Sequence, residues 1–97
     1  MTSRQPCVYI LANGYHGTLY VGVTTDLARR IFEHRESTGD SFVGRYDVRR
    51  LVYVEFHDRI DDAIQREKRL KDWKRSWKIR LIEEQNPEWR DLFDNII

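Results

Sequence analysis

The stretch that decides the fold is CVYILANGYHGTLYVGV, residues 7–23, in which two runs of strand-forming residues flank a short link. The link contains Asn13-Gly14 and Gly17, and two such runs around a Gly/Asn-rich link predict a β-hairpin. Farther along the chain, LVYVEF at residues 51–56 predicts a third strand, antiparallel to the hairpin. The sequence therefore predicts a three-stranded antiparallel sheet.

Three helices are expected around these strands. The first follows a capping residue at Thr25 or Asp26 and reaches about residue 35. The second begins among the aspartates at positions 58–62, which suit the positive end of a helix, and runs to about residue 73. The third covers residues 76–85 and is stopped by the Asn-Pro pair that follows.

Residues 37–47 contain Gly39 and Gly44 and are interpreted as a loop. The expected element order is then β-β-α-β-α-α, an α/β (α+β) fold with helices flanking a small sheet. The chain is treated as one domain over residues 1–97, with a core at about 5–85 and an acidic C-terminal tail at 86–97.

Composition narrows the class of protein. Hydrophobic residues make up 40% of the 97 residues and charged residues 34%, which excludes a disordered chain, a collagen-like repeat and a coiled coil. No run approaches the roughly 18 apolar residues of a membrane span, and the polar start does not resemble a signal peptide. The single cysteine, Cys7, rules out an internal disulfide. We expect a cytoplasmic protein that does not contact membranes.

Charge is unevenly placed although the net charge is only +1. Residues 65–80 hold eight basic residues against two acidic ones, and the sign reverses after Arg80. A basic block of this kind suits a polyanion such as nucleic acid, but it also fits an ordinary solvated helix face. The basic residues that we expect to hold nucleic acid are Lys68, Arg69, Lys71, Lys74, Arg75 and Lys78.

Glu67 falls on the apolar side of its predicted helix. At 100° per residue from Ile60, Glu67 lies at about 340°, among the positions of Ala63, Ile64 and Leu70. Three interpretations stay open for this carboxylate. It forms a buried salt bridge with Lys71 one turn along, it reaches solvent on a rotated helix, or it faces a cleft as a metal ligand.

Four further residues have the chemistry of a hydrolytic site. Arg30 and His34 are one turn apart on the first helix, and Tyr9 and Tyr20 lie one on each hairpin strand. Each alone is explained by packing or by an arginine stem that covers apolar surface. Together with Glu67 they supply the groups that phosphodiester hydrolysis needs: a cation ligand, an arginine for the phosphate and groups that move protons.

The ordered set resembles the GIY-YIG endonuclease family. Cys7-Val8-Tyr9 stands at the first signature and Tyr20-Val21-Gly22 at the second, with Arg30, His34 and Glu67 following at the family's spacings. The resemblance covers about residues 5–85 and looks closest to the small stand-alone bacterial branch, from the local patterns EKRLKDW at 67–73 and NPEW at 86–89. Cys7 replaces the first signature's glycine, and residues 74–80 lack the asparagine that many members carry there.

The resemblance implies a one-metal nuclease that acts on nucleic acid, with DNA preferred as the substrate. Glu67 would bind Mg²⁺ or Mn²⁺, Arg30 would contact the scissile phosphate, and His34 would transfer a proton or contact phosphate. Tyr9 and Tyr20 would line the site, one of them activating water, and Gly22 would leave space for substrate. Larger members of the family select their target with an added DNA-binding domain. Here a homodimer or a partner protein is the candidate that would supply target specificity.

Two other functions are weighed against the nuclease. One is a catalytically inactive nucleic-acid-binding module of the same fold, and the other is a protein-interaction domain that uses the basic helix and acidic tail. The intact Tyr9, Tyr20, Arg30, His34 and Glu67 set favours the nuclease. Trp73 and Trp77, interleaved with the basic block, are interpreted as core anchors rather than base-stacking platforms.

Overall fold

The computed structural model describes residues 5–36 and 42–95. Three strands, β1 (Cys7–Ala12), β2 (Leu19–Thr24) and β3 (Arg50–Phe56), form one antiparallel sheet in the order β2-β1-β3. The central strand is apolar throughout, and all six of its residues are buried because both faces of the sheet are covered. The predicted sheet and hairpin are therefore confirmed.

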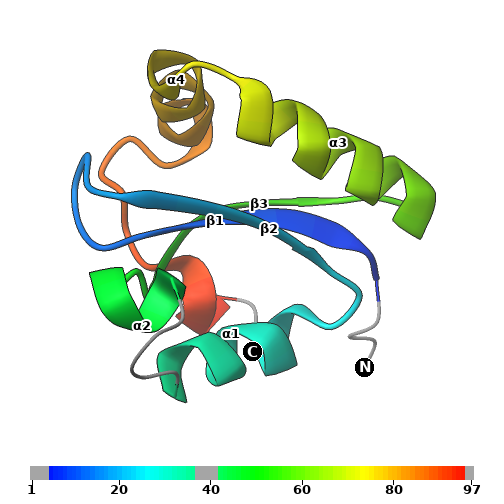
Figure 1. Cartoon of the computed structure of the whole chain (residues 1–97), viewed down its shortest axis with the longest axis horizontal. Helices are drawn as coiled ribbons and strands as arrows, with labels where there is room; N and C mark the ends of the chain where they lie inside the picture. The colour runs from blue at the N-terminus through cyan, green and yellow to red at the C-terminus, as the bar shows by residue number, and fades with distance from the viewer. Residues whose placement is uncertain (1–4, 37–41, 96–97) are drawn as a thin grey trace.

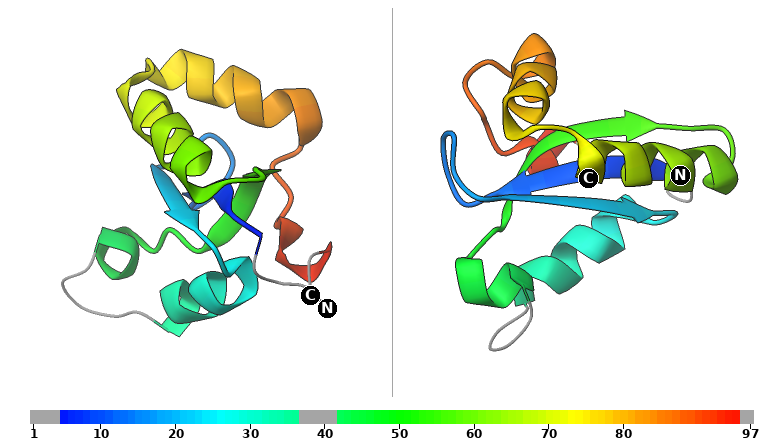
Figure 2. Two further views of the ribbon diagram at one scale, coloured as in Figure 1. Left: turned by 90° about the vertical axis from the view of Figure 1, so that its right-hand side faces the viewer. Right: turned by 45° about the horizontal axis from the view of Figure 1, so that its top comes forward.

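Helices cover both faces of this sheet (Figure 1). On one face lie α3 (Ile60–Asp72) and α4 (Arg75–Gln85), and on the other lie α1 (Leu27–Glu36), α2 (Phe42–Tyr46) and the short 3₁₀ helix η1 (Leu92–Asn95). The two layers are seen from other directions in Figure 2. The structure thus confirms an α+β fold.

Alternation along β1 divides the core into two clusters, one on each face. Val8, Ile10 and Ala12 face α3 and α4, together with Leu70 and Ile82 from those helices. Cys7, Tyr9 and Leu11 face α1 in the other cluster. Successive residues of one strand therefore serve opposite faces, and the candidate site belongs to the face that holds Tyr9.

The helix boundaries follow the predicted signals closely. The Asp26 side chain accepts a hydrogen bond from the Arg29 backbone at 3.3 Å, so it caps α1 as expected. Acidic residues occupy the first turn of α3, where they suit the helix dipole. Asn86 ends α4, and its backbone N–H donates to the Ile82 carbonyl at 2.8 Å.

The expected loop at residues 37–47 is wrong over its second half, where α2 forms. Residues 37–41 lie outside the described residues. Val43 is 3% exposed and packs into the α1-side cluster, and the rings of Phe42 and Tyr46, one turn apart, have centroids 4.8 Å apart. These apolar contacts outweigh the helix-weakening effect of Gly44, and Asp47 follows at a positive φ of 58°.

The buried face of α3 is rotated from the predicted arc. Ala63 and Leu70 are fully buried, but Ile60 and Ile64 are 38% and 37% exposed. The packed stripe therefore runs on the Ala63 side of Glu67, and Glu67 lies at its margin rather than at its centre. Its side chain is 12% exposed.

Residues 86–95, expected as a tail outside the core, pack against the sheet. Trp89 is fully buried, and its indole N–H donates to the Glu83 carboxylate at 2.8 Å. The Asn86 amide donates to the Val52 carbonyl at 3.1 Å, which ties this segment to β3. None of the helices in the described part of the chain is long and apolar enough to cross a membrane.

Candidate active site

The centre of the candidate site is a hydrogen bond between Tyr9 on β1 and His34 on α1. The phenol oxygen of Tyr9 lies 2.8 Å from His34 Nε2, and both side chains are buried. Burial lowers the pKa of His34, and the neighbouring Arg30 charge lowers it further. Burial also raises the pKa of Tyr9. Both groups are therefore uncharged near neutral pH, which leaves the imidazole a free base.

Gly22 on β2 makes room for the Tyr9 phenol. The two residues are direct partners in the antiparallel register. A Cβ atom at Gly22 would lie 2.4 Å from the Tyr9 hydroxyl oxygen and 2.5 Å from the ring carbon that carries it. The space that this glycine leaves is filled by Tyr9 itself, whose hydroxyl thereby extends across β2.

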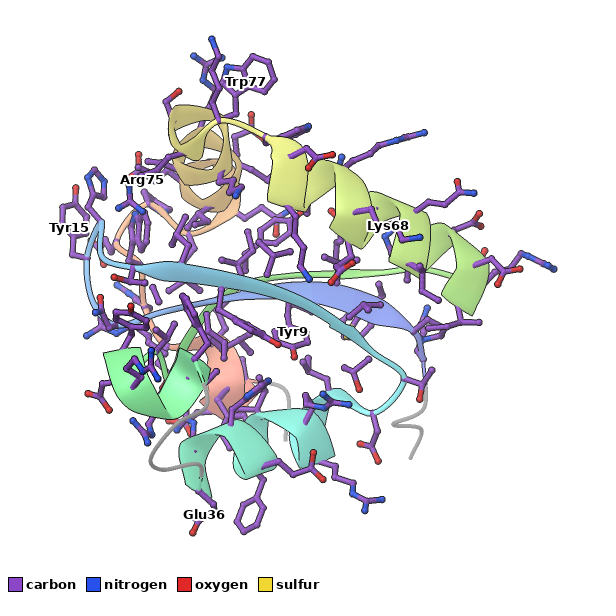
Figure 3. All side chains as sticks on the ribbon, viewed as in Figure 1. Tyr9, Tyr15, Glu36, Lys68, Arg75 and Trp77 are labelled. Carbon is purple, nitrogen blue, oxygen red and sulfur yellow. The ribbon has the colours of Figure 1, made fainter. Side chains whose placement is uncertain are left out.

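Tyr20 completes an aromatic cluster with Tyr9 and His34. It faces Leu11 in the strand register, so the two tyrosines are diagonal neighbours on one face rather than opposite each other. The Tyr20 ring centroid lies 6.4 Å from that of Tyr9 and 5.3 Å from that of His34. Tyr9 is 1% exposed whereas Tyr20 is half-buried, so Tyr20 is the phenol that reaches solvent. Figure 3 shows Tyr9 between the sheet and α1.

Phe42 is a neighbour of this cluster that sequence reasoning missed. Its ring centroid lies 5.8 Å from that of Tyr20. The residue was assigned to a loop, although the one-turn spacing of Phe42 and Tyr46 was a usable signal for a helix. The α2 helix therefore supports the solvent-facing tyrosine.

Arg30 lies beside the Tyr9–His34 pair and extends toward solvent. Its side chain is 45% exposed, and its Nε lies 3.5 Å from a Glu33 carboxylate oxygen. The guanidinium charge acts on both members of the pair, since it lowers the pKa of His34 and opposes the rise in that of Tyr9. It borders an open cavity of about 290 Å³ that is lined by Thr24, Thr25, Asp26, Arg29, Arg30 and Glu33. A positive group in this position suits an anionic substrate.

Glu67 comes from α3, on the other face of the sheet, and forms an ion pair with Lys71. Lys71 Nζ lies 2.7 Å from Glu67 Oε2, which raises the pKa of the ammonium group. The Glu67–Lys71 ion pair is therefore present, although the lysine side chain is 54% exposed. The Glu67 charge also contributes to raising the pKa of Tyr9, and Tyr20 contributes to raising that of Lys71.

The donor set at Glu67 fits a single magnesium or manganese ion. In residues 5–36 and 42–95, no group of three or more His, Cys, Asp or Glu side chains is placed to enclose a metal. Mg²⁺ commonly binds through one or two carboxylates and completes its shell with water and substrate phosphate. Glu67 supplies that one carboxylate, provided that Lys71 moves aside.

Of the six basic residues predicted to hold nucleic acid, Lys71 pairs with Glu67, and the other five fall into two groups. Lys68, Arg69 and Lys74 are exposed on α3 and the turn after it. Arg75 and Lys78 instead donate hydrogen bonds to backbone carbonyls. Arg75 Nη2 reaches His16 O at 2.6 Å and Gly17 O at 2.8 Å, and Lys78 Nζ reaches Lys71 O at 3.3 Å. Figure 3 shows Arg75 beside the hairpin loop that it holds.

The sequence matches the model of the GIY-YIG catalytic domain over residues 5–80. A UPF0213 protein of Natronomonas pharaonis is 40% identical over 76 residues, which cover 77% of this chain and 87% of that protein. A UPF0213 protein of Haloquadratum walsbyi is 40% identical over 68 residues, 69% of this chain and 75% of that protein. A UPF0213 protein of Staphylococcus saprophyticus is 34% identical over 68 residues, which cover 70% of this chain and 83% of that protein. No solved structure matches.

Proposed function

Because the chain belongs to the GIY-YIG family, we propose that it is an endonuclease that hydrolyses phosphodiester bonds of DNA with Mg²⁺ or Mn²⁺. The observation that carries the proposal is the buried Tyr9–His34 hydrogen bond, on which the charges of Arg30 and Glu67 both act. These groups come from β1, α1 and α3, three elements that are separate in the sequence. The relatives are archaeal as well as bacterial, a wider range than the bacterial branch expected from sequence.

In this proposal His34 is the proton acceptor. Its lowered pKa keeps Nε2 unprotonated near neutral pH, and Tyr9 Oη is 2.8 Å away. Tyr9 passes its proton to His34 Nε2 as it receives one from the attacking water. Tyr20, the more exposed phenol, orients that water on the substrate side.

Arg30 and Glu67 stabilise the substrate's charge. The Arg30 guanidinium donates hydrogen bonds to the phosphate oxygens, which gain negative charge as the water attacks. Glu67 would hold the divalent cation, which would polarise the scissile phosphate. In the metal-free protein Lys71 neutralises the charge of Glu67. We propose that a homodimer or a partner protein supplies the specificity for the target DNA.

The test is a cleavage assay on single-stranded, branched and plasmid DNA, in Mg²⁺, in Mn²⁺ and with EDTA. The parent protein should cleave at least one of these substrates only with metal. Glu67→Gln should remain folded and lose about two orders of magnitude of that activity, the scale on which single electrostatic groups act. Glu88→Gln is the control, because it changes an exposed glutamate in the segment after α4, and it should cleave like the parent. Cleavage by Glu67→Gln at the parent's rate would remove Glu67 from the mechanism.

A catalytically inactive nucleic-acid-binding module is the second candidate, and the Glu67–Lys71 ion pair favours it. A carboxylate already neutralised by lysine is a weaker cation ligand than a free one. Titration of Mn²⁺ into the protein separates the two functions. Metal binding that Glu67→Gln abolishes supports the nuclease, whereas DNA binding without metal binding supports the inactive module.

A further inference from the structure

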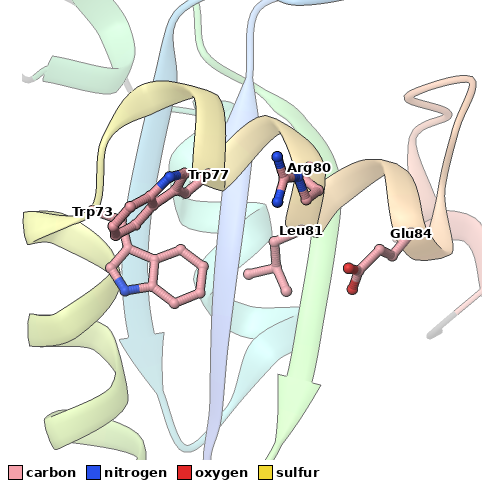
Figure 4. Close-up of a pocket in the computed structure, with 5 residues that line it drawn as sticks. All are labelled: Trp73, Trp77, Arg80, Leu81 and Glu84. Atoms are coloured by element: carbon pink, nitrogen blue, oxygen red, sulfur yellow. The ribbon is translucent and has the colours of Figure 1, made fainter.

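Two tryptophans form a cleft outside the candidate active site, where α3 meets α4. Trp73 and Trp77 line a cavity of about 310 Å³ together with Arg80, Leu81 and Glu84 (Figure 4). The two indole rings meet edge to face, with centroids 5.9 Å apart and planes at 84°. The cleft therefore has aromatic walls and an apolar side chain at Leu81, with one basic and one acidic residue beside them.

The two tryptophans differ in how firmly they are held. The Arg66 guanidinium lies 5.2 Å from the centre of the Trp73 ring, and Arg66 is itself bonded to Glu55 at 2.9 Å. Trp77 is 47% exposed and points away from the sheet (Figure 3). Trp73 is thus partly buried and held by its neighbours. Trp77 leaves much of its ring exposed, which core packing does not explain.

We propose that this cleft binds an unpaired base of a single-stranded nucleic acid, an inference that rests on the proposed function and narrows its substrate. A flat base stacks on indole regardless of its identity, as in proteins that bind single strands. Arg80 supplies hydrogen-bond donors and Glu84 supplies acceptors, and base edges present both kinds of group.

The charge around the cleft is complementary to a phosphate backbone. Lys74 Nζ lies 5.6 Å from the centre of the Trp77 ring, and Lys68 and Arg69 are exposed on the preceding helix. A strand whose base lies in the cleft therefore has cations beside its phosphates. An apolar segment of another protein would gain nothing from these charges.

The cleft is also near Glu67. Trp73 directly follows α3, six residues after Glu67, and five of those steps give a rise of about 7.5 Å along the helix axis. Lys71 and Lys74 lie between Glu67 and Trp77 in the chain. A single strand bound at Glu67 would extend along the end of α3 to reach the cleft. A duplex keeps its bases paired and stacked, so it cannot use the cleft in this way.

The experiment measures binding in EDTA, where no cleavage occurs. The probes are a labelled oligothymidylate, an oligomer of abasic sites of the same length, and a duplex of that length. Trp77→Ala should bind oligothymidylate about five- to a hundredfold more weakly than the parent, with no change for the abasic oligomer or the duplex. Trp77→Phe should keep most of the affinity. Phe32→Ala, which removes another exposed aromatic ring from α1, should bind all three probes like the parent.

Circular dichroism establishes that each variant is folded. Equal binding of oligothymidylate by Trp77→Ala and the parent overturns the proposal, and so does an equal loss for the abasic oligomer. A change in sedimentation with unchanged DNA binding would assign the cleft to protein contact and also overturn it. Metal-dependent cleavage of the same oligothymidylate is assayed separately. Base-dependent binding with no metal-dependent cleavage of single-stranded, branched or plasmid DNA would refute the nuclease but keep the cleft. Cleavage without base-dependent binding would refute only the cleft.

Discussion

Lys71 Nζ lies 2.7 Å from Glu67 Oε2, so the carboxylate at the candidate metal position already has a cation beside it. The lysine side chain is 54% exposed and the glutamate side chain 12% exposed, so the ammonium group can move into water while the carboxylate cannot. The ion pair therefore neutralises the Glu67 carboxylate with a side chain that remains largely in solvent. A divalent ion bound at Glu67 would have to displace the Lys71 side chain.

Removing this lysine should strengthen metal binding. Exposed ion pairs contribute about 0.2–1 kcal/mol, so Lys71→Met should tighten Mn²⁺ binding by up to about fivefold. Titration calorimetry or the electron paramagnetic resonance signal of free Mn²⁺ measures the change. Lys68→Met, which removes an exposed lysine from the same helix, is the matched control and should leave Mn²⁺ affinity unchanged. Weaker Mn²⁺ binding by Lys71→Met would show that the lysine supports the site rather than occupying it.

Arg30 and its neighbour Arg29 offer a matched pair of substitutions. The Nε atom of Arg30 lies 3.5 Å from a carboxylate oxygen of Glu33, and that of Arg29 lies 3.3 Å from the other oxygen. Of the two arginines, Arg30 is the one whose charge lowers the pKa of His34. Arg30→Ala should lower kcat by about 10²–10³ with a much smaller loss of DNA affinity, because its charge is used as the phosphate gains negative charge. Arg30→Lys should restore only part of the activity, since lysine lacks the planar guanidinium that donates two parallel hydrogen bonds to a phosphate. Arg29→Ala should cleave normally, and equal losses from both alanine variants would contradict a special role for Arg30.

The lowered pKa of His34 makes stability depend on pH in a defined direction. In the unfolded chain a histidine takes up a proton near pH 6.5, whereas burial keeps folded His34 neutral at that pH. The contribution of His34 is therefore complete above about pH 6.5, and the free energy of unfolding falls as pH decreases below that value. The groups around the imidazole are Tyr9, Tyr20, Arg30 and Glu33. The acid limb of the cleavage activity should lie below pH 6.5 for the same reason.

Urea unfolding between about pH 7.5 and pH 5 measures this effect. His34→Gln should flatten the fall in stability relative to the parent. Tyr9→Phe should lower stability by about 1 kcal/mol through the lost hydrogen bond and should keep the pH dependence, because the imidazole stays buried. A parent and a His34→Gln variant with parallel pH profiles would show that His34 does not titrate as proposed.

The two groups of basic residues should respond to different measurements. Lys68→Ala and Arg69→Ala should each reduce the slope of log affinity against log salt by about one unit, because their exposed charges suit phosphates. Arg75→Ala should instead lower the free energy of unfolding by about 1 kcal/mol, since Arg75 holds two carbonyls of the hairpin loop. Binding titrations at several salt concentrations and thermal melts check both outcomes. An unchanged slope in Lys68→Ala and Arg69→Ala would remove α3 from the DNA interface.

The sheet and its main helices were predictable because their signals are local. The strand-forming runs on either side of the Gly/Asn-rich link and the cap at Asp26 are properties of neighbouring residues, and the structure confirms the elements that they predict. The α2 helix was missed because its stability comes from contacts with distant residues, such as the packing of Val43 into the α1-side cluster. Burial of Trp89 was missed for the same reason, since its ring packs beside His16 of the distant hairpin loop.

The sequence names a set of candidate residues, but it does not predict how they are arranged. Helical spacing alone left Glu67 between a salt bridge and a metal ligand, and only the structure places Lys71 against it. The diagonal placement of Tyr9 and Tyr20 depends on the strand register, which the sequence does not fix. The carbonyl contacts of Arg75 depend on the position of the hairpin loop, so its charge alone suggested nucleic acid.

The interlock between Tyr9 and Gly22 constrains how this protein can diversify. The phenol at position 9 occupies the volume that any side chain at position 22 would need. A larger residue at position 22 is therefore compatible only with a smaller residue at position 9, and that exchange deprives His34 of its partner. A mutagenesis library that varies position 22 alone will therefore return few folded members, whereas joint randomisation of positions 9 and 22 explores the sequences that this sheet can accommodate.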